Sequence, residues 1–111
     1  MAIYSNFTID QGTTFSAYID VIDADDNILN LAGYTVAGQI RKSYNSTTFT
    51  AFSASISNAT GGTVNISLSA TQTNALKAGR YVYDVEITAS DATVTRIIEG
   101  QIEVTPGVTR A

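Results

Sequence analysis

The chain has 111 residues, of which 44% are hydrophobic and 14% are charged, and its formal net charge is −4. This composition is typical of one folded domain with an ordinary core, and it excludes a disordered chain. The acidic balance argues against nucleic acid as a partner, because phosphate binding requires clustered Lys and Arg, and the six basic residues here are dispersed.

Cys and His are both absent from the sequence. A disulfide and a thiolate zinc site are therefore excluded, and we expect neither a metal nor a cofactor. No apolar run approaches the roughly 18 residues of a membrane helix, so we expect no membrane partner. The first residues lack the basic and apolar regions of a secretory signal, so we expect a chain made in a cytoplasm and not secreted.

Seven segments are predicted as strands, most of them by the alternation of apolar and polar residues that is typical of half-buried strands. They are residues 3–9, 14–23, 35–42, 48–56, 63–69, 81–87 and 93–105. Phe49 and Phe52 lie three apart, which indicates a bulge or a break in the fourth segment. In the last segment, alternation places Val94 and Ile98 on the core face, and Gly100 predicts a close approach of another backbone.

The strand at residues 81–87 organises the predicted fold. Tyr81, Tyr83, Val85 and Ile87 alternate with mostly polar residues, so we expect these four side chains to face the core. A short helical turn at residues 70–76 precedes the strand, with Ser69 as its N-cap and Gly79 as its end. A tyrosine that enters a late strand from such a corner is typical of immunoglobulin-like sandwiches.

We therefore predict an all-β fold, an immunoglobulin-like antiparallel β-sandwich of about seven strands with one short helical turn. The short connections leave no room for crossover helices, which is why the sheets are expected to be antiparallel. The prediction assigns residues 1–111 to a single domain, in which residues 106–111 form a short C-terminal tail.

The sequence contains few candidate residues for metal binding or catalysis. The cluster at residues 23–27 (Asp-Ala-Asp-Asp-Asn) begins like a calcium loop, but Ile28 and Tyr34 stand where that loop needs Gly and Glu. We interpret the cluster as a polar hairpin turn. Nucleophilic catalysis has many Ser and Thr hydroxyl groups available, but no His or Cys that could serve as a base. The carboxylates of the strands fall on solvent-side positions, where charge usually only keeps the sheet face solvated. We therefore expect a protein that is not an enzyme.

Two sets of exposed residues are candidates for binding. Alternation places Val82 and Ile97 on the solvent side of the last two strands, together with Glu86 and Glu99, and we predict a protein–protein interface there. The alternative is a ligand site that uses tyrosines as stacking platforms for a carbohydrate or a receptor. Its candidate residues are Tyr18, Tyr34 and Tyr44.

Several motifs occur in an order and spacing that resemble a family of phage virion domains. They are Ile-Asp-Gln-Gly-Thr-Thr-Phe at 9–15, Leu-Ala-Gly-Tyr-Thr-Val at 31–36, Gln-Ile-Arg at 39–41, Gly-Thr-Val-Asn-Ile-Ser-Leu-Ser at 62–69, Leu-Lys-Ala-Gly-Arg-Tyr-Val-Tyr-Asp-Val-Glu at 76–86 and Gly-Gln-Ile-Glu-Val at 100–104. The chain is similar to the immunoglobulin-like N-terminal domain of phage upper baseplate proteins, and to small stand-alone structural proteins of tailed phages.

The resemblance implies a non-enzymatic structural component of a tailed-phage virion, in a head decoration, the tail or the baseplate. Its partners would be other virion proteins of the capsid, tail or baseplate, and copies of the chain would form a homo-oligomer or a symmetric array. The implied localisation is the virion. The alternative function is a carbohydrate- or receptor-binding adhesion module.

Overall fold

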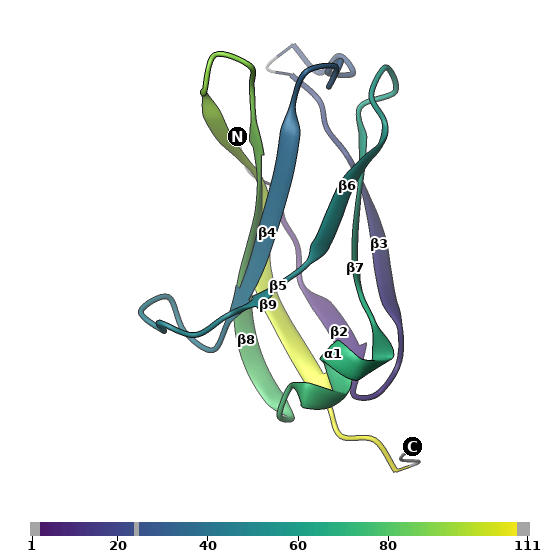
Figure 1. Ribbon diagram of the computed structural model, residues 1–111, viewed down its shortest axis with the longest axis vertical. Helices are drawn as coiled ribbons and strands as arrows, with labels where there is room; N and C mark the ends of the chain where they lie inside the picture. Colours follow the sequence, from purple (N-terminus) through teal and green to yellow (C-terminus); the bar gives the residue numbers. More distant parts are fainter. Residues whose placement is uncertain (1–2, 24, 109–111) are drawn as a thin grey trace.

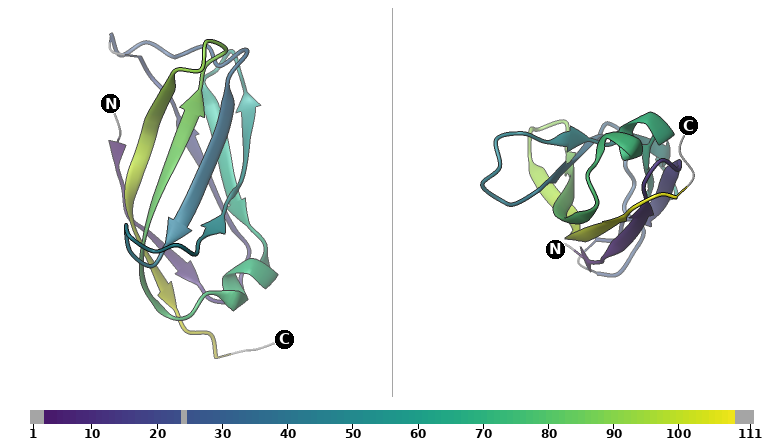
Figure 2. Two further views of the ribbon diagram at one scale, coloured as in Figure 1. Left: turned by 60° about the vertical axis from the view of Figure 1, so that its left-hand side comes forward. Right: turned by 90° about the horizontal axis from the view of Figure 1, so that it is seen from below.

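The computed structural model describes residues 3–23 and 25–108, which form two β-sheets packed face to face (Figures 1 and 2). The six-stranded sheet contains β1 (Ile3–Tyr4), β2 (Phe7–Asp10), β4 (Thr35–Arg41), β5 (Thr50–Ala51), β8 (Gly79–Thr88) and β9 (Val94–Thr105). The three-stranded sheet contains β3 (Phe15–Asp20), β6 (Ser53–Asn58) and β7 (Thr63–Leu68). One short helix, α1 (Ala70–Ala75), lies at one end of the sandwich. The predicted β-sandwich with one helical turn is confirmed.

The strand order of the larger sheet brings the two ends of the chain together. Its order is β1-β9-β8-β4-β5, with β2 also paired to β9, and the smaller sheet has the order β3-β7-β6. Both β1 and β2 run parallel to β9, whereas the other strand pairs of the described residues are antiparallel. The expectation of purely antiparallel sheets was therefore wrong at this edge, because β9 is paired here with the first strands of the chain.

The expected strand at residues 3–9 is interrupted between β1 and β2, where the chain crosses Gly100. A Cβ atom on Gly100 would lie 2.0 Å from the carbonyl oxygen of Ser5. Hydrogen bonds hold the crossing on both sides, from Ser5 N to the Glu99 oxygen (2.9 Å) and from Gln101 N to Asn6 Oδ1 (2.9 Å). The close backbone approach predicted for Gly100 is confirmed.

The second interruption, at Phe52, moves the chain from one sheet to the other. Phe52 is buried between β5 and β6, and its amide donates a hydrogen bond of 3.0 Å to the Gly38 oxygen of β4. Phe49 stays exposed. The spacing of the two phenylalanines thus marks a break between two short strands, and with the break at Ser5 the seven expected strands become nine in the described residues.

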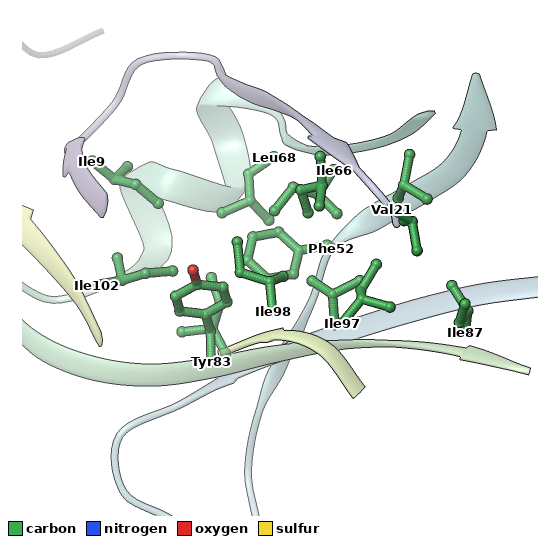
Figure 3. Packing of buried hydrophobic residues seen from close by; sticks show 14 of the residues in the cluster. Ile9, Val21, Phe52, Ile66, Leu68, Tyr83, Ile87, Ile97, Ile98 and Ile102 are labelled. Carbon is green, nitrogen blue, oxygen red and sulfur yellow. The ribbon is translucent and has the colours of Figure 1, made fainter. Parts of the chain in front are cut away.

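The core is centred on Tyr83 of β8, which is 4% exposed. Ring centroids of Phe7 and Phe52 lie 5.5 and 6.1 Å from the Tyr83 ring, and Phe15 packs against both phenylalanines. Aliphatic side chains from both sheets surround these rings (Figure 3). The predicted core face of β8 is confirmed, although Tyr81, at the end of the strand, is only partly buried.

The segment before β8 forms a short capped helix, followed by a corner. Ser69 Oγ accepts a hydrogen bond from Gln72 N, and Gln72 Oε1 accepts one from Ser69 N, so α1 begins with a capping box. The helix ends with Leu76 as its C-cap, and Gly79 opens β8, so the expectation that Gly79 ends the helix was wrong. The Tyr81 hydroxyl donates to the Lys77 carbonyl oxygen at 2.7 Å, which fixes this corner as expected for a tyrosine corner.

Candidate functional site

A hollow of about 420 Å³ lies on the outer face of the six-stranded sheet, over β4, β8 and β9. Ala37 of β4 and Val82 of β8 contribute its small apolar side chains. Polar and aromatic side chains surround them: Gln39, Arg41, Tyr44, Asp84, Glu86, Arg96 and Glu99. Strand pairing places Asp84 between Gln39 and Glu99 in the middle of this surface, with Val82 beside Arg41 towards one end and Ala37 beside Glu86 towards the other.

The loop between β4 and β5 forms one wall of the hollow and projects from the sandwich beside β4 (Figure 1). Arg41 at the end of β4 positions this loop. Its guanidinium donates hydrogen bonds to the Ser46 carbonyl oxygen and to Gln39 Oε1, and it lies 4.9 Å from the centroid of the Phe49 ring. These contacts fix the base of the loop, and Tyr44 at its tip remains 79% exposed.

The charges along the strands are partly paired. Arg96 of β9 forms ion pairs with Asp84 (3.2 Å) and Glu99 (3.7 Å), all three side chains being partly exposed. Such exposed pairs contribute little stability, typically about 0–1 kcal/mol, but they fix the positions of the charges. Among the described residues, Glu86 has no cationic partner within ion-pair distance, so its carboxylate is available to a ligand.

Three of the four predicted interface residues, Val82, Glu86 and Glu99, line this hollow. The placement of Ile97 on the same face was wrong, since Ile97 is 5% exposed. A β-bulge is the reason: Val85 pairs with Ile98 but the next residue, Glu86, pairs with Arg96, so β9 contains one extra residue.

The bulge turns Ile97 and Ile98 together into the core, where Figure 3 shows both side chains among the buried residues. The bulge also places the residues of β9 that precede Ile97 on the face opposite to the expected one. Val94, expected inside, is consequently 56% exposed, and Arg96 faces the hollow. Two consecutive isoleucines in an otherwise alternating strand were the signal in the sequence from which this bulge was predictable.

The three candidate tyrosines lie on different surfaces. Tyr44 lines the hollow, Tyr18 lies on β3 of the other sheet with its ring exposed, and Tyr34 is partly buried at the far end of the sandwich. No single platform contains them. Of the three, only Tyr44 lies beside the charged residues of the hollow.

The aspartate cluster forms a turn, as interpreted from the sequence. Asp23 Oδ1 accepts hydrogen bonds from Asp25 N (2.9 Å) and Asn27 N (3.0 Å), and Ile22 and Ile28 pair across it. Ala24 lies outside the described residues. Within residues 3–23 and 25–108, no three His, Cys, Asp or Glu side chains are grouped so that they would hold a metal ion. The helix of this described part is too short to cross a membrane.

Sequence reasoning missed the contribution of β4 to the site. Gln39 and Arg41 alternate with the core-facing residues of this strand, so their solvent-side placement was predictable. Their proximity to Val82 and Asp84 depends on the pairing of β4 with β8, in which Gln39 lies opposite Asp84 and Arg41 opposite Val82. The alternation of a single strand contains no information about which strand lies beside it.

Tyr83 lies beneath the hollow with its phenol turned into the protein. Its hydroxyl donates a hydrogen bond of 2.6 Å to the Ser5 carbonyl oxygen. Burial raises the pKa of this phenol above its ordinary value of about 10, and the neighbouring Tyr4 raises it further.

The raised pKa predicts a loss of stability in alkali. The folded protein holds the Tyr83 proton more tightly than the unfolded chain does, so this contribution is complete below pH about 10 and is lost as the pH rises towards the raised pKa of the folded state. Urea denaturation measured at increasing alkaline pH should show a steeper loss of unfolding free energy for the parent protein than for Tyr83→Phe. Parallel curves would contradict the assignment of this effect to Tyr83.

Comparisons with known proteins show no sequence relative of this chain. No protein-family model matches the sequence, and no curated protein matches it. Similar solved structures include an internalin-like protein of Listeria monocytogenes, with a TM-score of 0.45, 16% identity, and coverage of 96% of this chain and 28% of that one. Another is a family 123 glycoside hydrolase from Clostridium perfringens, with a TM-score of 0.44, 14% identity, and coverage of 96% of this chain and 24% of that one. The chain thus spans only about a quarter of the structures it matches.

Proposed function

We propose that this chain is a non-catalytic docking domain of a tailed-phage virion, and that it binds a neighbouring virion protein through the hollow over β4, β8 and β9. The observation that carries the docking role is the composition of the hollow, which combines the apolar side chain of Val82 and the exposed ring of Tyr44 with charges that are partly ion-paired. The virion role rests on the resemblance of the ordered sequence motifs to phage structural domains.

The chemistry of the hollow suits a protein partner. Stable interfaces combine apolar and polar side chains, and Tyr and Arg dominate their binding energy. Here Arg41 lies opposite Val82 and Tyr44 lines the same hollow, while Arg96 lies further along it, opposite Glu86. Hydrogen bonds or ion pairs already hold both guanidinium groups. A partner would therefore meet side chains that lose little further freedom on binding. Glu86 would pair with a cationic group of the partner, in capsid, tail or baseplate.

The substitution Val82→Lys tests this docking surface. It replaces an apolar side chain of this surface with a charge, and we expect incorporation into particles to be at least about tenfold weaker. Folding should be preserved, because a change on the solvent side of a strand lowers the free energy of unfolding by about 1 kcal/mol or less. Incorporation is measured by quantitative mass spectrometry of purified particles, with thermal melting as the test of folding.

Tyr18→Lys is the matched control, because it adds the same charge to an exposed residue of the other sheet. It should leave incorporation unchanged. Absence of the parent chain from purified tailed particles would overturn the virion role. Normal incorporation of a folded Val82→Lys variant would overturn the assignment of the docking surface.

A second candidate function is binding of a carbohydrate in the same hollow. The exposed ring of Tyr44 offers a stacking face beside Arg41, Asp84 and Glu86, and such side chains bind sugar hydroxyl groups. Titration with a panel of host-surface glycans distinguishes the two functions. Saturable binding that Tyr44→Ala abolishes would favour the carbohydrate module over protein docking.

A further inference from the structure

A second hollow, of about 520 Å³, opens between the two sheets at the end of the sandwich that carries the loop from β3 to β4. We call it the lateral slot. Ile87 of β8 and Ile97 of β9 form its deep part, and both side chains belong to the core. Ile3 and Ile22 lie nearer the surface and are each about half exposed. The slot is therefore an apolar opening that reaches the core from outside.

The charged side chains of the slot are acidic. Asp20, Asp23 and Asp26 line it, and its lining within the described residues contains no Lys or Arg. One oxygen of Asp23 is used in the turn, and Asp20 accepts a hydrogen bond of 3.2 Å from the Thr63 hydroxyl, but neither forms an ion pair among the described residues. The charge and shape of the slot thus suit an occupant with an apolar side chain and a cationic one.

The backbone beside the slot favours an extended occupant. Asp20 ends β3, and among the described strands β3 pairs with β7 alone. Its other edge therefore offers backbone groups to which an incoming segment can hydrogen-bond as an added strand.

We propose that the lateral slot binds residues 108–111 of a second copy of this chain. Their sequence is Val-Thr-Arg-Ala, and Arg110 is the only basic residue after β9. Val108 is 98% exposed, and residues 109–111 lie outside the described residues. In an extended segment, residues two apart face the same side, so Val108 enters the slot while Arg110 meets the aspartates at its rim.

The occupant comes from another copy because the chain cannot reach its own slot. Strand β9 runs from Thr95, which lines the slot, to Thr105 at the end of the sandwich that carries α1 (Figures 1 and 2). At a strand rise of roughly 3.3 Å per residue, these ten steps span about 33 Å. Arg110 follows Thr105 by five residues, which extend at most about 18 Å. The contact is therefore between molecules and joins two different surfaces, so its repetition gives rings or filaments.

A mixing experiment with two variants tests the contact. The first variant ends at Gly107 and keeps only the slot, and the second, Ile22→Lys, keeps the tail but carries a positive charge in the slot. We expect the parent chain to associate with increasing concentration in sedimentation velocity and each variant alone to remain monomeric. An equimolar mixture of the two variants should form dimers but no larger species, because only the tail of the second variant can enter the slot of the first.

Charge reversal identifies the ion pair. Arg110→Glu should weaken association of the parent chain by about tenfold or more, and Asp20→Arg in the same chain should restore it. Ser55→Lys, which adds a charge at an exposed position of β6, the strand of this sheet that does not pair with β3, should associate like the parent.

Monomeric behaviour of the parent at all concentrations would overturn the proposal, as would undiminished association of the chain that ends at Gly107. These measurements use the pure protein, so they are independent of incorporation into particles. The docking surface at Val82 and the lateral slot can therefore fail separately.

Discussion

Replacing Tyr83 with Ala is expected to lower the free energy of unfolding by about 3–5 kcal/mol, the range for truncating a buried aromatic residue. The ring is 4% exposed and packs against Phe7 and Phe52, so its removal leaves a cavity where the two sheets meet. The substitution also removes the donor to the Ser5 carbonyl oxygen. Urea denaturation followed by circular dichroism provides the measurement.

Tyr83→Phe separates the two contributions. It keeps the ring and deletes only the hydroxyl, so the loss should be about 1 kcal/mol, the typical net contribution of one hydrogen bond. Tyr18→Ala, at an exposed ring, should change stability by less than about 0.5 kcal/mol. A loss below about 1 kcal/mol for Tyr83→Ala would mean that the core is not built around this ring.

The second large effect is expected for Gly100→Ala. The added Cβ atom would lie 2.0 Å from the Ser5 oxygen and 2.8 Å from the Ser5 carbonyl carbon, both of them backbone atoms. Backbone cannot rotate aside as a flexible side chain does, so the segment at Ser5 must move away from β9. We expect a loss of about 3 kcal/mol, at the upper end of the range for overpacking.

Gly33→Ala is the control for the glycine substitution itself. Gly33 has a positive φ of 82° and no atom within 4 Å of the added Cβ, so its cost is limited to backbone strain of about 1–2 kcal/mol. Hydrogen exchange should also separate the two variants. Only Gly100→Ala should expose the Ser5 amide, which is bonded to the Glu99 oxygen in the parent. Equal stability losses with no change in Ser5 exchange would contradict the close approach.

The regular strands were predictable because burial on one side imposes a period of two. The core faces of β7 and β8 follow this rule. So does β4, on which Val36 is partly buried and Ile40 is buried. The capping box of α1 was predictable for a different reason, since Ser69 and Gln72 interact within one turn of chain. Alternation and capping patterns therefore predict a residue's position wherever the residues that determine it are close in sequence.

The departures arise where a distant segment decides the local structure. Ile97 is buried because the register between β8 and β9 shifts at Glu86, and the strand expected at residues 3–9 breaks because it must pass over Gly100. The hollow is a further case. Its residues come from three strands and a loop. Alternation gave the faces of β4 and β8 but not that of Arg96, which the bulge reverses, and it contained no information about which strands lie side by side.

The pairing of the first strands with the last has a consequence for synthesis. Asn6 bonds to Gln101, which is 95 residues further along, and β2 has its sheet neighbour in β9. On the ribosome, the apolar residues of β2 therefore lack their docking strand until β9 has been made. Proteins dominated by such non-local pairings fold slowly, and their unpaired strand edges aggregate. We expect nascent chains that stop before Val94 to depend on chaperones, and nonsense fragments of that length to be degraded rather than accumulate.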